Sequence, residues 1–213
     1  DGDPGNIPLT AAGAPAGLVL TPSLPATGNP VETTAVFTPT AAGTSVVTFT
    51  ATDGDGCTAD TTVTLVASAR PAFGGDTPAE GSELVVCVGD ELTYEVAVSD
   101  ADAADAVTLS VSGAPGDLEH TPTLPATGAA GAGVTTTARY TPGAGDAGQT
   151  FTVTYTASDN SGAACAATRT FRIRVSHVPV ITATQSVLNV CVGDTATFRV
   201  RATDGDPGNV TLT

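Results

Sequence analysis

Gln149-Thr-Phe-Thr-Val-Thr-Tyr-Thr-Ala-Ser-Asp159 is the stretch that decides the fold. Its apolar and aromatic residues alternate with threonines, which is the period of two expected of a β-strand with one buried face. Threonine is β-branched and favours a strand even on the solvent side. The same alternation recurs in residues 92–98 and 171–175, and no helical period of useful length occurs. The sequence therefore predicts an all-β chain.

The chain also repeats itself. Leu24–Gly28 (Leu-Pro-Ala-Thr-Gly) recurs as Leu124–Gly128, and Cys87–Asp90 (Cys-Val-Gly-Asp) recurs as Cys191–Asp194. Matching residues lie between 100 and 108 positions apart, and the offset changes in small steps, as it would if loop residues were inserted between fixed strands. The repeating unit is a module of about 100 residues, within the usual size of a domain.

Three segments follow from the repeat. Residues 71–177 form a complete module, residues 1–70 lack its first two strands, and residues 178–213 supply those two strands and the start of a third. The motif Asp-Gly-Asp-Pro-Gly-Asn occurs at 1–6 and again at 204–209. Two interpretations stay open. The segment is a window on a longer array, which the repeated motif favours, or the tail of one chain completes the head of the next by donor-strand assembly.

The complete module is expected to be a seven-strand immunoglobulin-like β-sandwich. A Pro- and Gly-rich stretch that ends at Gly133 shows little strand character. The expected strands are A, ending at 84–88; B, 91–99; C, 106–112; E, 134–140; F, 149–158; and G, 165–176. Residues 140–159, followed by this G strand, resemble the cadherin-like and hyalin-repeat immunoglobulin-like modules of large bacterial surface proteins. The resemblance implies an extracellular or cell-surface location and a role as a spacer, stalk or adhesive repeat.

Charge and composition exclude several classes of protein. The formal net charge is −15 and lysine is absent, so the chain would repel the phosphate backbone of a nucleic acid. No stretch approaches 18 apolar residues, so no membrane span is expected. Only nine aromatic residues are available, and the cores must be built mainly from valine, leucine, alanine and threonine.

Acidic residues gather in the loops expected at one pole of each module. The resemblance implies Ca²⁺ binding through an Asp-x-Asp in the B–C loop, and hard carboxylate ligands suit this ion. The linker 176–179 lacks the acidic motif of true cadherins, and Asp, Asn and Gly are also ordinary turn residues, so plain turns are the alternative. The candidate Ca²⁺ ligands are Asp1, Asp3, Asp53, Asp55, Asp100, Asp102, Asp105, Asp159, Asp204 and Asp206.

The four cysteines occupy two kinds of position. Cys87 and Cys191 end strand A, whereas Cys57 and Cys165 open strand G. There is no Cys-x-x-Cys, so zinc is not expected, and a recurrent pair in a secreted chain indicates disulfides. The two positions of one module lie at opposite poles, about 25–30 Å apart at 3.3 Å per residue, beyond the reach of a bridge. A head-to-tail bridge between consecutive modules or chains is favoured, and free thiols are the alternative.

No motif indicates catalysis, and we expect no enzyme. His120 and His177 have no counterparts in the other copies, and hydrolase, zinc-protease and phosphate-loop motifs are absent. Both Leu-Pro-Ala-Thr-Gly copies lie within modules, without the apolar stretch and basic tail of a sortase signal. Asn209 begins a lone N-glycosylation sequon.

The sequence thus predicts a non-enzymatic structural repeat of an extracellular filament, stalk or adhesin. Its modules stack head to tail, with disulfides and Ca²⁺ reinforcing the junctions, and its expected partners are copies of itself. The alternative is a Ca²⁺-dependent adhesion module that binds a surface glycan or a receptor. A glycan platform usually needs exposed aromatic rings, and no unique aromatic surface is evident in the sequence.

Overall fold

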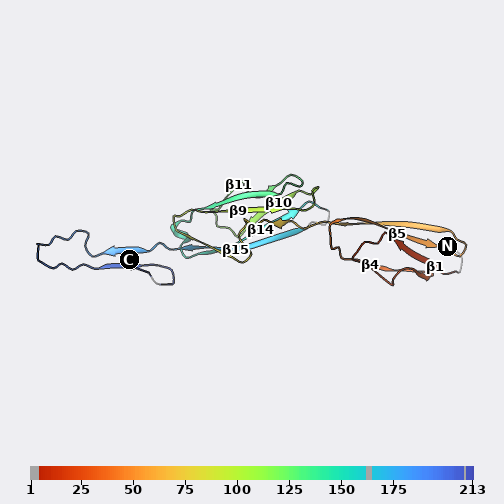
Figure 1. Ribbon diagram of the computed structural model, residues 1–213, viewed down its shortest axis with the longest axis horizontal. Coiled ribbons are helices and arrows are strands. Elements are labelled where there is room, and N and C mark those ends of the chain that lie inside the picture. The colour runs from red at the N-terminus through yellow and green to blue at the C-terminus, as the bar shows by residue number, and fades with distance from the viewer. Residues whose placement is uncertain (1–4, 162–164, 209) are drawn as a thin grey trace.

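The computed structural model describes residues 5–161, 165–208 and 210–213, and it places three β-rich segments end to end (Figure 1). We call residues 5–67 the head segment, residues 72–176 the central sandwich and residues 178–208 the tail segment. The candidate ligands Asp1 and Asp3 and the sequon residue Asn209 lie outside the described residues. Within the described part of the chain, no helix is long and apolar enough to cross a membrane.

The central sandwich consists of two packed sheets of five and four strands, in the orders β12-β10-β14-β15-β8 and β11-β13-β9-β7. All neighbours are antiparallel except β8 and β15, which run parallel. This strand order is that of an immunoglobulin-like β-sandwich. The strands are β7 Ala72–Phe73, β8 Glu83–Cys87, β9 Leu92–Ser99, β10 Val107–Ser112, β11 Glu119–Thr121, β12 Ala126–Thr127, β13 Val134–Tyr140, β14 Thr150–Asp159 and β15 Ala166–Ser176.

The predicted all-β class and sandwich fold are confirmed, and strands A, B, C, E, F and G fall within a residue or two of the expected positions. The structure corrects one detail. The stretch expected to have little strand character contains β11 and β12, and a further short strand, β7, precedes β8. These strands have only two or three residues, too few for an alternating pattern to show in the sequence. A 3₁₀ turn, Ala144–Asp146, lies between β13 and β14.

The core of the central sandwich is small and built around three rings. Tyr155 stacks on Phe171 at 5.9 Å between ring centroids, and Tyr94 meets Phe171 edge-on at 5.4 Å. Both sheets surround these rings with buried aliphatic side chains, including Val96 and Leu109, as the shortage of aromatic residues requires. Alternation in β14 is clear, since Val153, Tyr155 and Ala157 are buried and the threonines between them are exposed or half-buried.

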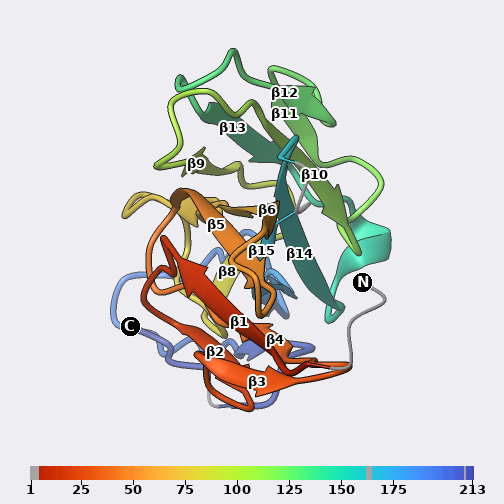
Figure 2. The ribbon, with the colours of Figure 1, turned by 90° about the vertical axis from the view of Figure 1, so that its right-hand side faces the viewer.

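The head segment repeats the later part of this architecture in two smaller sheets, with the orders β3-β1-β5-β6 and β2-β4 (Figure 2). Its strands match the central ones in register. Leu9 pairs with Ala51, as Leu109 pairs with Ala157. The strands are β1 Ile7–Ala12, β2 Leu18–Thr21, β3 Ala26–Gly28, β4 Thr34–Phe37, β5 Gly43–Thr52 and β6 Thr58–Ala67.

The tail segment contains one antiparallel pair, β16 Val180–Ala183 with β17 Val200–Thr203. Ile181 pairs with Ala202, as Phe73 pairs with Val98 in the central sandwich. The tail therefore begins a sandwich in the way that β7 and β9 begin the central one.

Candidate functional site

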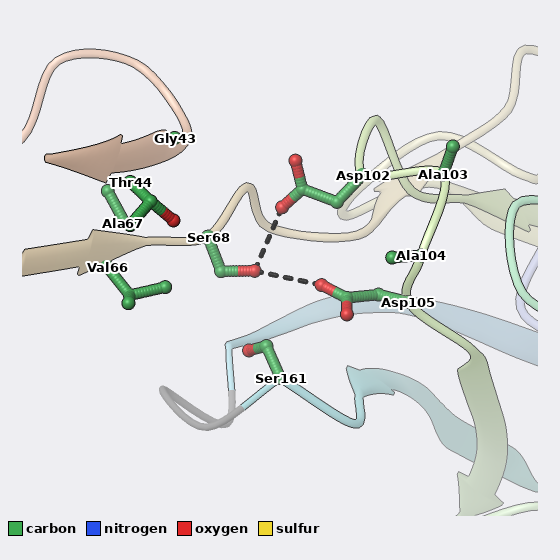
Figure 3. A pocket seen from close by; sticks show the side chains of 10 residues that line it. All are labelled: Gly43, Thr44, Val66, Ala67, Ser68, Asp102, Ala103, Ala104, Asp105 and Ser161. Carbon is green, nitrogen blue, oxygen red and sulfur yellow. Dashed lines mark hydrogen bonds between the residues drawn. The ribbon is translucent and has the colours of Figure 1, made fainter.

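At the first junction, the residues that follow β6 contact the loop between β9 and β10, mainly through the carboxylate of Asp102. Asp102 Oδ2 accepts hydrogen bonds from Ser68 Oγ at 2.9 Å and from the backbone N–H of Ala69 at 2.7 Å. Asp105 Oδ2 lies 3.1 Å from the same hydroxyl. Figure 3 shows both carboxylates directed at Ser68 from the central sandwich. We call this arrangement the acid clamp.

The second junction repeats the acid clamp. Asp206 Oδ2 accepts hydrogen bonds from Ser176 Oγ at 2.6 Å and from the backbone N–H of His177 at 2.7 Å. Hydrogen bonds to a charged acceptor are the strong ones in proteins, and they fix direction as well as distance. At both junctions, a serine hydroxyl and the backbone N–H of the next residue donate to the same aspartate oxygen.

The contacts of the second clamp lower the pKa of Asp206. The hydroxyl of Ser176, followed by His177, holds the pKa of the Asp206 carboxyl at about 2, below its ordinary value of 3.8. His177 Nδ1 also lies 3.0 Å from Asp206 Oδ1. Because these donors stabilise the charged carboxylate, the second clamp is formed at neutral pH.

One pair of side chains differs between the two junctions. Ala69 of the first junction corresponds to His177 of the second, and Ala101 corresponds to Gly205. A Cβ atom added at Gly205 would lie 2.6 Å from the His177 ring. The second junction therefore has space for the His177 side chain only because residue 205 is a glycine.

The structure separates the predicted Ca²⁺ ligands into different groups. Among the described residues, carboxylate oxygens of Asp100, Asp102 and Asp105 lie within 4.8 Å of one another, and so do ligand atoms of Asp204, Asp206 and His177. The carboxylates of the F–G loops do not join these groups. Asp159 Oδ1 accepts from the backbone N–H of Ser161 at 3.1 Å and of Cys165 at 3.1 Å.

The matching loop of the head uses its acids in the same way. Asp53 Oδ1 accepts from the backbone N–H of Asp55 at 3.0 Å and of Cys57 at 2.8 Å, and Asp55 is exposed. These contacts are those of a turn in which an aspartate binds its own following backbone.

Two buried carboxylate oxygens have no hydrogen-bond partner among the described residues. Asp100 Oδ2 and Asp159 Oδ2 are both buried and unpaired. An open cavity of ≈ 800 Å³ lies between the head segment and the central sandwich, lined by residues that include Ser68, Asp102 and Asp105. Figure 3 shows Asp102 and Asp105 at its rim, and no aromatic ring is among the described residues that line it.

Two of the four cysteines, Cys87 and Cys165, lie at the junctions. Cys87 is the register partner of Ser176 in the parallel pair of β8 and β15, next to the second clamp. Cys165 Sγ lies 3.8 Å from the backbone oxygen of Ser68, at the first clamp. All four thiols are unbonded.

Sequence reasoning missed the serines of the clamps. Ser68 directly follows β6 and Ser176 is the last residue of β15. The two serines are 108 residues apart, the same offset that relates Cys57 to Cys165. That shared offset is the signal that could have found them.

No protein-family model matches the chain, and no curated protein matches it. Solved structures with similar arrangements include three of tandem domains. The titin Ig tandem domains are 15% identical, with 81% of this chain and 83% of that chain covered, at a TM-score of 0.32. Human CDH23 EC21-23 is 20% identical, with 78% and 55% covered, at 0.36. The protocadherin GammaB4 extracellular domain is 14% identical, with 95% and 32% covered, at 0.39.

Overlaps at this level carry no argument about activity or partners. The assignment of the fold therefore depends on the strand order and register of the chain itself. They define a protein of tandem immunoglobulin-like β-sandwich modules, of which the central sandwich has both sheets in full.

Proposed function

We propose that the chain is a non-enzymatic structural repeat of an extracellular stalk or filament, in which modules stack head to tail. The observation that carries this proposal is the repetition of the acid clamp. Ser68 with Ala69, and Ser176 with His177, each donate two hydrogen bonds to one carboxylate of the following module. A contact used at successive junctions orients each module on the one before it, which is what a spacer requires.

The central sandwich is well arranged to bear tension along the array. Force enters through β7 and then β8, and it leaves through β15. Strands β8 and β15 run parallel from the pair Glu83–Arg172 to the pair Cys87–Ser176. Pulling on opposite ends of two parallel strands loads all of their hydrogen bonds together in shear. The sheet therefore resists extension as a unit.

Small-angle X-ray scattering by the reduced 213-residue protein tests the stacking. An extended, rod-like distance distribution supports the proposal, and it should shorten and broaden in the double variant Asp102→Ala/Asp206→Ala. Asp55→Ala/Asp76→Ala removes two exposed acids outside both clamps and is the control for loss of charge. A compact particle, or no difference between the clamp variant and the control, would contradict the proposal.

We further propose that Ca²⁺ binds at the first junction. The favouring observation is Asp100 Oδ2, a buried carboxylate oxygen without a partner in a group that also includes Asp102 and Asp105. These three residues would hold the ion, which supplies positive charge where three carboxylates meet. Calorimetric titration with Ca²⁺ should show binding that Asp100→Asn weakens. Absence of heat at millimolar Ca²⁺ would remove this proposal and leave the stacking proposal untouched.

A further inference from the structure

The second junction brings an imidazole to two carboxylates. His177 directly follows β15, and its Nδ1 lies 3.0 Å from Oδ1 of Asp206, in the residues after β17. One ligand atom each of His177, Asp204 and Asp206 lies within 4.8 Å of the other two. The group takes its imidazole from the linker and its carboxylates from the tail segment. An ion held there would therefore contact both sides of the junction.

The two oxygens of Asp206 have separate contacts. Oδ2 accepts the hydrogen bonds of the acid clamp from Ser176 Oγ and from the backbone N–H of His177. Oδ1 lies beside the imidazole instead. An ion can therefore bind Oδ1 while the clamp through Oδ2 stays intact.

Two glycines fix the position of the imidazole ring. A Cβ atom added at Gly205 would lie 2.6 Å from Cδ2 of His177, and one added at Gly148 would lie 2.9 Å from Cε1. Backbone thus approaches the ring from two segments, and a side chain on either glycine would displace it. This packing holds Nδ1 toward the carboxylate, as a metal site requires, since its ligands must be held in place by their surroundings.

The spacing of the nitrogen and the oxygen suits a small transition-metal ion. Zn²⁺ binds imidazole nitrogen and carboxylate oxygen at about 2.0–2.2 Å. Two such ligand atoms on one ion lie roughly 3.0 Å apart at a right angle and roughly 3.4 Å apart at the tetrahedral angle. The distance between Nδ1 of His177 and Oδ1 of Asp206 is 3.0 Å. Asp204 is exposed, so its carboxylate can rotate toward the same ion.

The ligand types separate this group from the one at the first junction. There, Asp100, Asp102 and Asp105 offer oxygen alone, which suits Ca²⁺. The nitrogen of His177 favours Zn²⁺ and neighbouring transition metals, because imidazole suits these ions whereas carboxylate alone suits Ca²⁺. Ala69, the counterpart of His177, has no ligand atom in its side chain. The two junctions therefore differ in the class of ion that they fit.

We propose that His177, Asp204 and Asp206 form a binding site for a divalent transition-metal ion of the Zn²⁺ class. Three protein ligands leave at least one coordination position for water. The bound ion connects the linker to the residues after β17, and it stiffens the second junction independently of the first. This stiffening rests on the stacking proposed above, whereas binding of the ion does not.

Imidazole ¹⁵N NMR tests the site directly, with Zn²⁺ as the probe. All four cysteines of the 213-residue chain are replaced by serine, because free thiols also bind Zn²⁺. The chain contains two histidines, and His120 is an internal control, since its Nε2 lies 2.8 Å from the Tyr155 hydroxyl. One equivalent of Zn²⁺ should move the Nδ1 resonance of His177 to a metal-bound position and leave His120 unchanged.

An unchanged Nδ1 resonance of His177, with or without Zn²⁺ bound elsewhere, would overturn the proposal. The contact of His177 with Asp206 would then be a hydrogen bond or ion pair only. Millimolar Ca²⁺ should leave the metal-bound resonance in place, because Ca²⁺ takes oxygen ligands. Displacement of Zn²⁺ by Ca²⁺ at this concentration would overturn the assignment of the ion class.

A matched pair of variants separates the site from general charge. In the same cysteine-free chain, Asp204→Asn removes one proposed ligand, and Asp194→Asn removes an exposed acid of the same tail segment. Loss of an outer-shell partner costs a metal site about 10–100-fold in affinity, and loss of a ligand should cost at least as much. Calorimetric titration with Zn²⁺ should show this weakening for Asp204→Asn and none for Asp194→Asn. Equal affinities of the two variants would overturn the proposal.

The metal site and the stacking of modules fail separately. X-ray scattering by zinc-free protein tests the clamps alone. A metal-bound His177 together with no scattering difference between Asp102→Ala/Asp206→Ala and its control would support the site and contradict the stacking. A scattering difference together with an unchanged His177 resonance would do the reverse.

Discussion

The acid clamp makes a quantitative prediction about one amide proton. In the variant Asp102→Ala, the backbone N–H of Ala69 loses the carboxylate oxygen that accepts it at 2.7 Å. A hydrogen bond to a charged acceptor contributes about 1.5–3 kcal/mol to stability. Each 1.36 kcal/mol is a factor of ten. We expect the Ala69 amide to exchange with solvent about 10- to 150-fold faster, as measured by hydrogen exchange with NMR detection in reduced protein.

The second junction provides the control within the same molecule. The N–H of His177 donates to Asp206 at 2.7 Å, and it should keep its protection when Asp102 is replaced. Asp206→Ala should have the reverse effect, exposing His177 and sparing Ala69. Unchanged protection of Ala69 in Asp102→Ala, or equal loss at both amides, would refute the assignment of one carboxylate to each junction.

Three further predictions follow from the contacts described above. The pKa of Asp206 is lowered to about 2, so the second clamp stabilises the junction fully above pH 3.8, and this stabilisation is lost as the pH falls through 2. A titration of the Asp206 carboxyl carbon by ¹³C NMR should have its midpoint near 2, and a midpoint near 3.8 would contradict this. Gly205→Ala brings a methyl group within 2.6 Å of the His177 ring and should speed hydrogen exchange of the residue 177 amide. In a His177→Ala background, the same substitution should leave the exchange rate of this amide unchanged. Equal effects in the two backgrounds would show that the ring is not responsible. Tyr155→Phe removes the hydroxyl that lies 2.9 Å from the Tyr94 hydroxyl and 2.8 Å from His120 Nε2, and should destabilise the central sandwich by about 1–3 kcal/mol in urea unfolding; a change below about 0.5 kcal/mol would show that these two contacts contribute little.

The strands of the central sandwich were predictable because their alternation is long. Residues 149–159 contain several repeats of the apolar–polar pattern, and β14 occupies nearly the same range. Strands β11 and β12 were not predictable in this way. They are three and two residues long, and their pairing with β13 and β10 depends on the tertiary fold.

The site was predictable in its position and only partly in its chemistry. The sequence places acids at the module poles, and Asp102 and Asp206 do lie at the junctions. It does not show that they accept hydrogen bonds from Ser68 and Ser176, because a serine at a strand end has no distinctive local pattern. Asp53 and Asp159 illustrate the opposite case, in which a candidate ligand binds the backbone of its own turn.

Residual dipolar couplings of the reduced protein test the central claim, the fixed stacking of modules through the acid clamp, most directly. The account predicts that amides of the head segment and of the central sandwich fit one common alignment tensor, with the orientation seen in Figure 1. In Asp102→Ala the two segments should require different tensors. Separate tensors already in the unaltered protein would show that the modules reorient freely, and would contradict the account.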